Sequence, residues 1–259
     1  MSNGSKVLLV TGGARGIGAA AAEVFSQHGY DVSILDILPP AEADDIRQKV
    51  QANGARCLYI QCDVAGEAQV KQAVQQTLAE LGTIDVLVNN AGIVLVAAVE
   101  DIPYEQFMRV VSVNLGGTFL LCKHVLPVLK AKRGGAIVNM GSVSGHVGQI
   151  DHSSYGSTKG AIIAFTRALA WEVAKYGIRV NSISPGSVDT PMLRGDIQIE
   201  SEKTGLPFEE VKKIREAEQA FNRWADPLEI GEAIYFLASD KASFITGTDL
   251  LVDCGWVAK

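Results

Sequence analysis

The sequence predicts an α/β protein: a single domain, residues 1–259, in which helices cover both faces of a doubly wound parallel sheet of seven strands. Seven short runs rich in Val, Ile and Leu recur along the chain, and six of them are near-continuously apolar, as strands covered on both faces must be. Segments of helical character separate these runs, and such alternation predicts right-handed crossovers. No repeat, linker or low-complexity tract interrupts the alternation, so one domain accounts for the length.

The expected elements follow from this reading in chain order. Apolar runs place the strands at 6–11, 31–36, 56–61, 84–89, 135–140, 179–184 and 249–252. Helices are expected between them, at 16–28, 41–53, 67–81, 104–132, 154–176 and 227–238. One segment departs from the pattern: residues 192–224 are rich in Glu and Lys and lie between two core elements. This segment is either a solvated helical excursion or a lid over a substrate, and the two interpretations are compatible.

Composition excludes several classes of function. With 47% hydrophobic and 20% charged residues the chain has the composition of a soluble globular protein. A net charge of -6 and the lack of a block of consecutive Lys or Arg argue against nucleic acid as a partner. The apolar run after the N-terminus is too short for a signal peptide, and no run approaches eighteen apolar residues. We therefore expect a cytoplasmic protein that does not insert into a membrane.

The sequence contains no pattern typical of a metal site. Its four cysteines show no CxxC spacing and fall in apolar surroundings, so we interpret them as reduced core residues rather than metal ligands. The four histidines show neither HxxxH nor HExxH spacing. We expect no metal.

A glycine-rich loop, Thr11-Gly12-Gly13-Ala14-Arg15-Gly16-Ile17-Gly18, follows the first predicted strand and opens the first predicted helix. This context distinguishes a dinucleotide-binding loop from a chance glycine cluster. Glycines let the backbone approach a pyrophosphate, whose charge then faces the N-terminus of the helix. The sequence therefore predicts a dinucleotide cofactor.

Asp36 indicates which dinucleotide. It ends the second predicted strand eighteen residues after Gly18, close to the distance at which an acidic side chain binds the adenosine ribose hydroxyls. A carboxylate there would repel the 2′-phosphate of NADP, and Ile37 and Leu38 supply no compensating cation. Arg15 works against this interpretation because it could reach a 2′-phosphate. We expect NAD in preference to NADP.

Tyr155 and Lys159 suggest the chemistry. On a helix they lie at i and i+4 on one face, which places an ammonium beside a phenol. A fixed cation favours the phenolate and brings a tyrosine that titrates near ~10 towards working range for a base. The pair alone would indicate no function, but together with the upstream glycine loop it favours a functional interpretation.

These motifs together resemble the short-chain dehydrogenase/reductase family from about Lys6 to the tail at Gly255. The TGxxxGxG loop, Asn89-Asn90-Ala91-Gly92, Asn114, Ser142, the YxxxK pair and Pro185-Gly186 occur in the family's order. The resemblance implies a Rossmann fold with NAD(P)-dependent oxidoreductase activity, and commonly a homotetramer. The loop spacing differs from the TGxxGxxG of the family's extended, nucleotide-sugar-modifying branch.

The resemblance also implies roles for single residues. Tyr155 would move the hydroxyl proton, Ser142 would hold the substrate oxygen against the phenol, Lys159 would also bind the nicotinamide ribose, and Asn114 would position a water that links Lys159 to solvent. Taken singly, Ser142 would be a capping or turn serine and Asn114 an ordinary polar residue. The implied cofactor contacts, with Tyr155 and Lys159 added, are Gly12, Arg15, Gly16, Ile17, Gly18, Asp36, Asp63, Val64, Asn90, Gly92, Pro185, Gly186, Val188 and Thr190.

Some of these residues have simpler interpretations. Asn89-Asn90 alone would be a turn signal, and Asp63 alone would be a helix N-cap. Under the resemblance, Asp63 and Val64 lie at the adenine, Asn90 and Gly92 at the adenosine side, and Val188 and Thr190 at the nicotinamide carboxamide.

The substrate wall is expected between Ser142 and Tyr155 and in the charged excursion. Its histidines could instead be merely solvated. A mixed polar and apolar wall suits a small polyol, a sugar or a cyclic hydroxy-ketone better than a long acyl chain or a steroid. The candidate substrate contacts are Ser144, His146, Gln149, His152, Met192 and Trp224.

The leading hypothesis is an NAD-dependent oxidoreductase that acts on a secondary alcohol or its ketone. An NADPH-dependent 3-oxoacyl thioester reductase is the alternative within the enzyme class, favoured by Arg15 and disfavoured by Asp36. A catalytically silent dinucleotide-binding sensor is the third hypothesis, but such a protein could lose Tyr155, Lys159 or Ser142, and all three are present. The expected partners are a small-molecule substrate and further copies of the chain.

Overall fold

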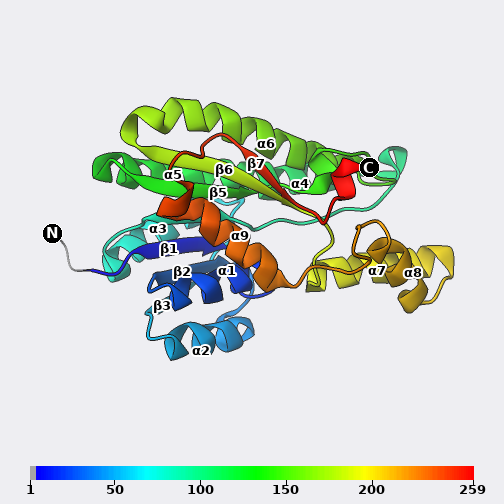
Figure 1. Ribbon diagram of the computed structural model, residues 1–259, viewed down its shortest axis with the longest axis horizontal. Coiled ribbons are helices and arrows are strands. Elements are labelled where there is room, and N and C mark those ends of the chain that lie inside the picture. Colours follow the sequence, from blue (N-terminus) through cyan, green and yellow to red (C-terminus); the bar gives the residue numbers. More distant parts are fainter. Residues whose placement is uncertain (1–3) are drawn as a thin grey trace.

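A seven-stranded sheet forms the centre of the computed structural model, which describes residues 4–259 (Figure 1). The strand order is β3-β2-β1-β4-β5-β6-β7, and every neighbouring pair is parallel. The predicted doubly wound seven-stranded sheet is confirmed. The strands are β1 (Val7–Thr11), β2 (Asp31–Asp36), β3 (Cys57–Gln61), β4 (Val86–Asn89), β5 (Gly135–Met140), β6 (Ile178–Pro185) and β7 (Asp249–Val252).

Helices lie at all the predicted positions, with ends shifted by a few residues. They are α1 (Gly16–Gln27), α2 (Asp44–Ala52), α3 (Glu67–Leu81), α4 (Tyr104–Val111), α5 (Gly117–Lys132), α6 (Ser153–Val173), α7 (Pro191–Thr204), α8 (Phe208–Glu216) and α9 (Pro227–Ala238). Short 3-10 turns follow or precede several of them, at Pro40–Ala43, Val99–Asp101, Val143–Gly145, Ala174–Tyr176, Asp240–Ala242 and Trp256–Ala258.

Alternating side chains of the strands build two separate cores. In β1, Leu8 and Val10 pack with α1, α2 and α9 on one face, whereas Leu9 packs with α3, α5 and α6 on the other. All three side chains are fully buried. The side chains of one strand alternate between the faces of a sheet, so a strand covered on both sides must be apolar throughout. This explains why the strands were recognisable as continuous apolar runs.

The helix expected at 104–132 consists of three parts. A π-helical turn, Ser112–Gly116, separates α4 from α5. The whole segment has the length and hydropathy of a membrane span, with a mean hydropathy of 1.3. Several of its apolar side chains, including Leu121 and Val125, are buried in the core beside the sheet.

The charged excursion forms α7 and α8, which lie beyond one end of the sheet (Figure 1). They pack around a small apolar cluster of Ile197, Val211 and Trp224, with Leu193 and Phe208 at its edge. The excursion is therefore helical, as expected.

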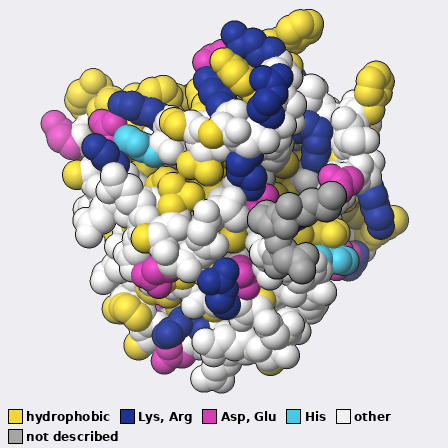
Figure 2. Space-filling model, turned by 90° about the vertical axis from the view of Figure 1, so that its left-hand side faces the viewer, with side chains coloured by type: hydrophobic (Ala, Val, Ile, Leu, Met, Phe, Trp, Pro, Cys, Tyr) yellow, Lys and Arg dark blue, Asp and Glu magenta, His cyan; other side chains and the backbone are white. Residues whose placement is uncertain are grey.

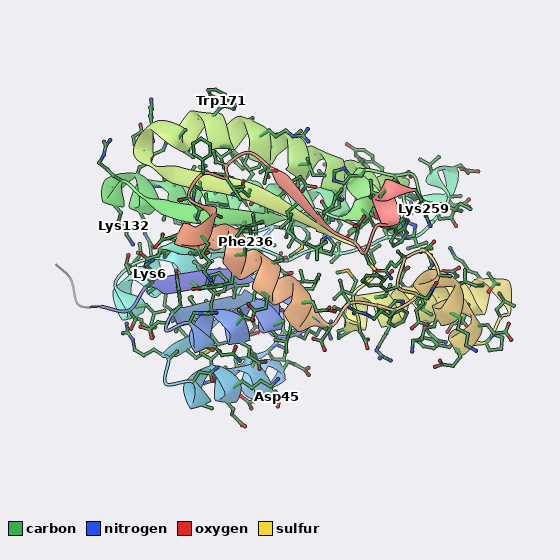
Figure 3. The ribbon with its side chains drawn as sticks, in the orientation of Figure 1. Lys6, Asp45, Lys132, Trp171, Phe236 and Lys259 are labelled. Atoms are coloured by element: carbon green, nitrogen blue, oxygen red, sulfur yellow. The ribbon has the colours of Figure 1, made fainter. Side chains whose placement is uncertain are left out.

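The opposite end of the sheet, where the strands begin, carries charges of both signs. Lys6 and Lys132 lie there, far from α7 and α8 (Figure 3). Lys6 pairs with Asp240 at 3.8 Å and Lys132 pairs with Asp85. Figure 2 shows this face, with acidic, basic and apolar side chains interspersed. The predicted cofactor and substrate residues lie at the other end, where the strands finish.

Candidate active site

A cavity of about 380 Å³ lies at the carboxyl ends of the strands, below α7. The strand order reverses between β1 and β4, and ligands of open α/β sheets bind in the crevice at such a switch point. Most of the residues expected to contact the cofactor line this cavity. They are Gly12, Arg15, Gly16, Ile17, Asp36, Asp63, Val64, Asn90, Gly92, Tyr155, Lys159, Pro185, Gly186, Val188 and Thr190.

Two glycines of the loop are required by its geometry. Gly12 adopts φ 63°, in the left-handed region that side chains disfavour. A Cβ on Gly18 would lie 2.2 Å from the carbonyl oxygen of Gly12, so only glycine lets α1 approach the end of β1 this closely. Gly18 thus contributes by permitting the turn, and it lies behind the cavity wall.

Asn90 fastens the glycine loop to the end of β4. Its Nδ2 donates to the carbonyl oxygens of Thr11 and Gly12, each at 3.0 Å, and its N–H donates to the Thr11 hydroxyl at 3.0 Å. The amide therefore shapes the loop while it also borders the cavity.

Two acidic residues stand along the rim expected to hold the adenosine. Asp36 is 7% exposed, and its carboxylate accepts hydrogen bonds from the N–H groups of Ala14 (2.9 Å) and Leu38 (3.1 Å). Asp63 accepts from the N–H of Ala65 and pairs with Arg109 at 3.1 Å. The helix that follows begins after Gly66, so Asp63 caps a turn rather than the helix.

Tyr155 and Lys159 lie on α6 and both line the cavity. The Lys159 Nζ lies 5.4 Å from the centroid of the Tyr155 ring and donates to the Met140 carbonyl oxygen at 2.8 Å. Burial lowers the pKa of Lys159 to about 8. Burial also raises the pKa of Tyr155 to about 12, with a smaller opposing effect from its hydrogen bond to Ser142 and a further rise from the charge of Asp196.

The expectation that Lys159 depresses the Tyr155 pKa is wrong for the protein chain taken alone. Desolvation disfavours both charged forms, and it is the largest cause of the shift in each pKa. Sequence spacing established that the two side chains share a face, but it contained no information about their burial.

Ser142 begins a chain of hydroxyl contacts towards the substrate side of the cavity. It follows β5, and its hydroxyl lies 3.2 Å from the Ser144 hydroxyl. The Ser144 hydroxyl in turn donates to the Gln149 side chain. Ser142 also lowers the pKa of Tyr155, and the phenol, the two serines and the amide all line the same cavity.

Asn114 lies in the π-helical turn, behind Gly92 and fully buried. Its Oδ1 accepts from the N–H of Ile93 at 2.8 Å, and its Nδ2 donates to the Ile93 carbonyl and the Thr158 hydroxyl, each at 3.0 Å. A π-turn re-aims a side chain from within a helix and is frequent at functional sites. Asn114 therefore connects the segment after β4 to α6.

The six candidate substrate contacts divide into two groups. Ser144, Gln149, His152 and Met192 line the cavity. The structure does not bring His146 or Trp224 to the cavity wall. His146 Nε2 lies 2.7 Å from Asp249, and Trp224 fills the apolar cluster under α7 and α8, where its ring packs beneath Arg194 and Lys212.

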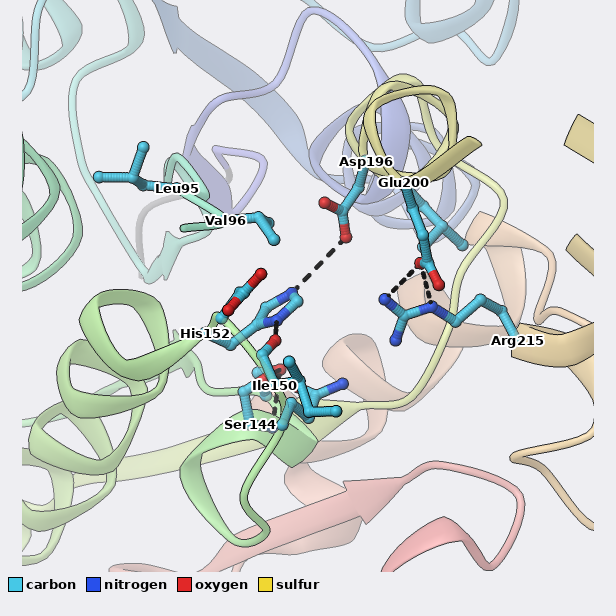
Figure 4. A network of polar contacts seen from close by, with 12 residues as sticks. Leu95, Val96, Ser144, Ile150, His152, Asp196, Glu200 and Arg215 are labelled. Atoms are coloured by element: carbon cyan, nitrogen blue, oxygen red, sulfur yellow. Dashed lines mark hydrogen bonds and ion pairs between the residues drawn. The ribbon is translucent and has the colours of Figure 1, made fainter. Parts of the chain in front are cut away.

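The lining residues that sequence reasoning missed include Asp196 of α7, Arg215 of α8 and Trp256. Figure 4 shows His152 and Asp196 pointing towards each other, with Arg215 and Glu200 paired beside them. The charged character of the excursion was visible in the sequence. The available signal, Asp196 and Glu200 one helical turn apart, did not indicate which partners lie across the cavity.

The residues present fit a dinucleotide. The glycine loop has the positive φ and close backbone approach that a pyrophosphate site needs, and it leads into the N-terminus of α1. Thr190 caps α7 by accepting from the N–H of Leu193, and it lies so near Gly16 that a Cβ added there would meet its methyl group at 3.3 Å. The loop, the acidic rim at Asp36 and the phenol of Tyr155 thus border one cavity in the order that such a cofactor requires.

Comparison with known proteins agrees with this architecture. Residues 12–257 match the profile of a family described as enoyl-(acyl carrier protein) reductase. The cis-4-hydroxycyclohexanecarboxylate dehydrogenase of Sinomonas cyclohexanicum is 40% identical over 98% of this chain and 97% of its own length. The trans-4-hydroxycyclohexanecarboxylate dehydrogenase of the same organism is 38% identical over 98% and 93%.

Solved structures give the same result. The crystal structure of levodione reductase superposes with a TM-score of 0.93 at 31% identity and covers 98% of both chains. A short-chain dehydrogenase/reductase from Burkholderia xenovorans gives a TM-score of 0.93 at 34% identity and covers 99% of this chain and 98% of its own. The chain accordingly belongs to the short-chain dehydrogenase/reductase family, a family of oxidoreductases that use nicotinamide dinucleotides.

Proposed function

We propose that this protein uses NAD to oxidise a secondary alcohol on a small ring, or to reduce the corresponding ketone, with Tyr155 as the acid and base. The observation that carries the proposal is that Tyr155, Ser142 and Lys159 border one cavity together with the glycine loop and Asp36. Proton transfer and hydride transfer at one carbinol carbon need this juxtaposition.

Each protein group then has a defined role in oxidation. Ser142 holds the substrate hydroxyl against the Tyr155 oxygen, and the Tyr155 phenolate takes the proton from that hydroxyl. Lys159, held by the Met140 carbonyl, supplies positive charge within the same buried site. NAD, when bound, would accept the hydride from the carbinol carbon and add the positive charge of its nicotinamide ring. In reduction the Tyr155 phenol returns the proton to the developing alkoxide.

The preference for NAD rests on Asp36. Its carboxylate is fixed at the end of β2 by two backbone N–H groups and borders the cavity. A fixed buried carboxylate suits ribose hydroxyls as donors and repels a 2′-phosphate. Arg15 borders the same cavity and is the residue that favours NADP.

The proposal of a cyclic substrate rests on the residues that line the cavity and on the names of two related dehydrogenases. Ser144 and Gln149 offer hydrogen bonds, while Val94, Met192 and Trp256 offer apolar surface. The two Sinomonas relatives are named for hydroxycyclohexanecarboxylates, which combine an apolar ring with polar substituents. A ring of that kind suits this mixed wall.

The 3-oxoacyl thioester reductase remains the second candidate, because Arg15 lies at the cofactor rim and the matching family profile carries an acyl-carrier-protein description. A steady-state assay separates the two. It compares NAD with NADP for cyclic alcohols, and NADH with NADPH for a 3-oxoacyl thioester. The proposal expects NAD-linked turnover of cyclic alcohols, and a higher kcat/KM for the thioester with NADPH would contradict it.

We also propose that the protein forms a homotetramer. Large apolar side chains stand exposed on α5, α6 and the segment before β7: Phe119 (49% exposed), Trp171 (88%) and Phe244. Trp171 points outward from α6 (Figure 3). Sedimentation velocity tests the proposal, and a monomer at micromolar concentration would contradict it.

A further inference from the structure

A cluster of charged side chains closes the substrate side of the cavity beneath α7 and α8. It consists of His152, Asp196, Glu200, Arg215 and Glu218, which we call the lid cluster. His152 comes just before α6, and the other four belong to α7, α8 and the turn after α8. His152, Asp196 and Arg215 line the cavity.

Arg215 presents its guanidinium to the cavity while its carboxylate partners lie behind it. Its Nε and Nη2 bind one oxygen of Glu200 at 2.9 and 2.7 Å, and its Nη1 lies 3.7 Å from Glu218. Neither glutamate belongs to the cavity lining formed by residues 4–259. Burial raises the pKa of Glu218 above its ordinary value. A guanidinium has five N–H donors, so this one retains donors for a further acceptor.

His152 presents a second positive group. It is 6% exposed, and its Nδ1–H donates to the Ile150 carbonyl at 2.6 Å. Its Nε2 lies 3.6 Å from Asp196, an ion-pair distance longer than that of a good hydrogen bond (Figure 4). Burial lowers the pKa of His152, but Asp196 and the Ile150 carbonyl together raise it above its ordinary value.

The ionisable groups that face the cavity at this end are thus one guanidinium, one imidazole and one carboxylate. Asp196 is paired with His152, and Arg215 is backed by carboxylates outside the wall. A buried cation with unused donors binds a carboxylate more strongly than a neutral group, because charge-assisted hydrogen bonds are about twice as strong as neutral ones.

We propose that Arg215 and His152 form a subsite for an anionic group of the substrate, a carboxylate on the ring away from the reacting carbinol carbon. This inference rests on the proposed function and names the substrate class more closely: a cyclic hydroxy acid. Tyr155 and Ser142 hold one end of the ring, and the lid cluster holds the other. Asp196 is a positioning residue, since it orients and charges His152 rather than contacting the carboxylate.

The test compares three six-membered alcohols that differ only at position 4: 4-hydroxycyclohexanecarboxylate, its carboxamide and 4-methylcyclohexanol, each as separate cis and trans isomers. The wild-type kcat/KM should be highest for the carboxylate, by roughly tenfold to a hundredfold over the carboxamide, and mainly through KM. Equal kcat/KM for carboxylate and carboxamide would overturn the proposal, because the subsite would then bind a neutral polar group as well as an anionic one.

Three variants test whether the preference for the carboxylate arises at Arg215. Arg215→Met should raise the KM for the carboxylate by roughly tenfold to a hundredfold and leave 4-methylcyclohexanol within about twofold. Arg223→Met is the matched control, because Arg223 also pairs with a glutamate, Glu229, but does not line the cavity. Equal losses for carboxylate and methyl compounds in Arg215→Met, repeated in Arg215→Met/Glu200→Gln where the unpaired charge of Glu200 is also removed, would show a structural role and overturn the subsite.

The pH profile tests His152. The carboxylate substrate stays ionised above about pH 5, so its KM should rise as pH passes upward through the His152 pKa, where the imidazolium loses its charge. The KM of the carboxamide should stay flat. A flat profile for both substrates would remove His152 from the subsite.

Failure of the proposed function gives a different result. If no cyclic alcohol is turned over, the subsite can still be tested by calorimetry, which measures the affinity of the NAD-saturated protein for cyclohexanecarboxylate and for cyclohexanecarboxamide. Tighter binding of the carboxylate that is lost in Arg215→Met supports it. Equal or undetectable binding of both compounds overturns it.

Discussion

Lys159 donates to the carbonyl oxygen of Met140, at 2.8 Å, rather than to the phenol of Tyr155, whose ring centroid lies 5.4 Å from its ammonium. The carbonyl at the end of β5 therefore fixes the position of the Lys159 ammonium, and α6 carries both side chains. This relationship separates two functions that the YxxxK spacing combines, the placement of charge and the transfer of a proton.

Tyr155→Phe should abolish turnover and leave dinucleotide binding nearly intact. The substitution removes only the proton-transferring oxygen, and general acid/base groups contribute on the order of a hundredfold or more. Single-turnover kinetics and calorimetric titration with NAD measure the two effects separately. More than about one hundredth of wild-type turnover would contradict the assigned role.

Lys159→Met should reduce turnover and weaken NAD binding together. It removes a buried charge from beside the reacting centre and, under the family resemblance, a contact to the nicotinamide ribose. It also leaves the Met140 carbonyl without its donor. Calorimetry on the purified variant checks the second effect, and unchanged affinity for NAD would show that Lys159 acts on the chemistry alone.

The pH dependence should have opposite signs in the two directions. Oxidation needs the Tyr155 phenolate, so its rate should rise with pH towards the Tyr155 pKa, which burial places at about 12 in the chain alone. Ketone reduction needs the phenol, so its rate should hold at neutral pH and fall in alkaline solution. A pH-independent oxidation rate, with chemistry shown to be rate-limiting by a deuterium isotope effect, is incompatible with this mechanism.

Asp36→Ser should weaken NAD and strengthen NADP. The change removes the negative charge that repels a 2′-phosphate, and Arg15 at the same rim can then pair with it. A hydrogen-bonded charge contact is worth about 1.5–3 kcal/mol, so the ratio of kcat/KM values should move by roughly tenfold to a hundredfold. If the wild type already prefers NADP, Arg15 outweighs Asp36 and the thioester reductase becomes the better assignment.

Gly18→Ala should destabilise the protein and impair dinucleotide binding, because the added Cβ would meet the Gly12 carbonyl at 2.2 Å. Forced overpacking of this kind costs typically about 1–3 kcal/mol. Gly195→Ala is the matched control: a Cβ there meets no atom of the described chain within 4 Å, and alanine in α7 should stabilise by up to ~1 kcal/mol. Denaturant unfolding of both variants measures the difference, and equal stability would contradict the close approach.

The sequence by itself determined the sheet and the cofactor end. Parallel strands covered on both faces are near-continuously apolar, so β1 and β4 stand out as apolar runs whatever their neighbours are. The glycine loop is equally local. Gly12 is required by its own backbone conformation, and Gly18 is required by the close approach of its backbone to the Gly12 carbonyl. Constraints between residues this close along the chain can be recognised from the sequence alone.

Only the tertiary structure decided the rest of the site. His146 and His152 look alike in the sequence, yet one pairs with Asp249 of β7 and the other reaches the cavity. Arg215 and Asp196 joined the site because α7 and α8 fold back over the strand ends, a long-range contact that no spacing encodes. The Tyr155 pKa was expected in the wrong direction for the same physical reason: desolvation depends on everything packed around a group, whereas spacing reports only its neighbours along one helix.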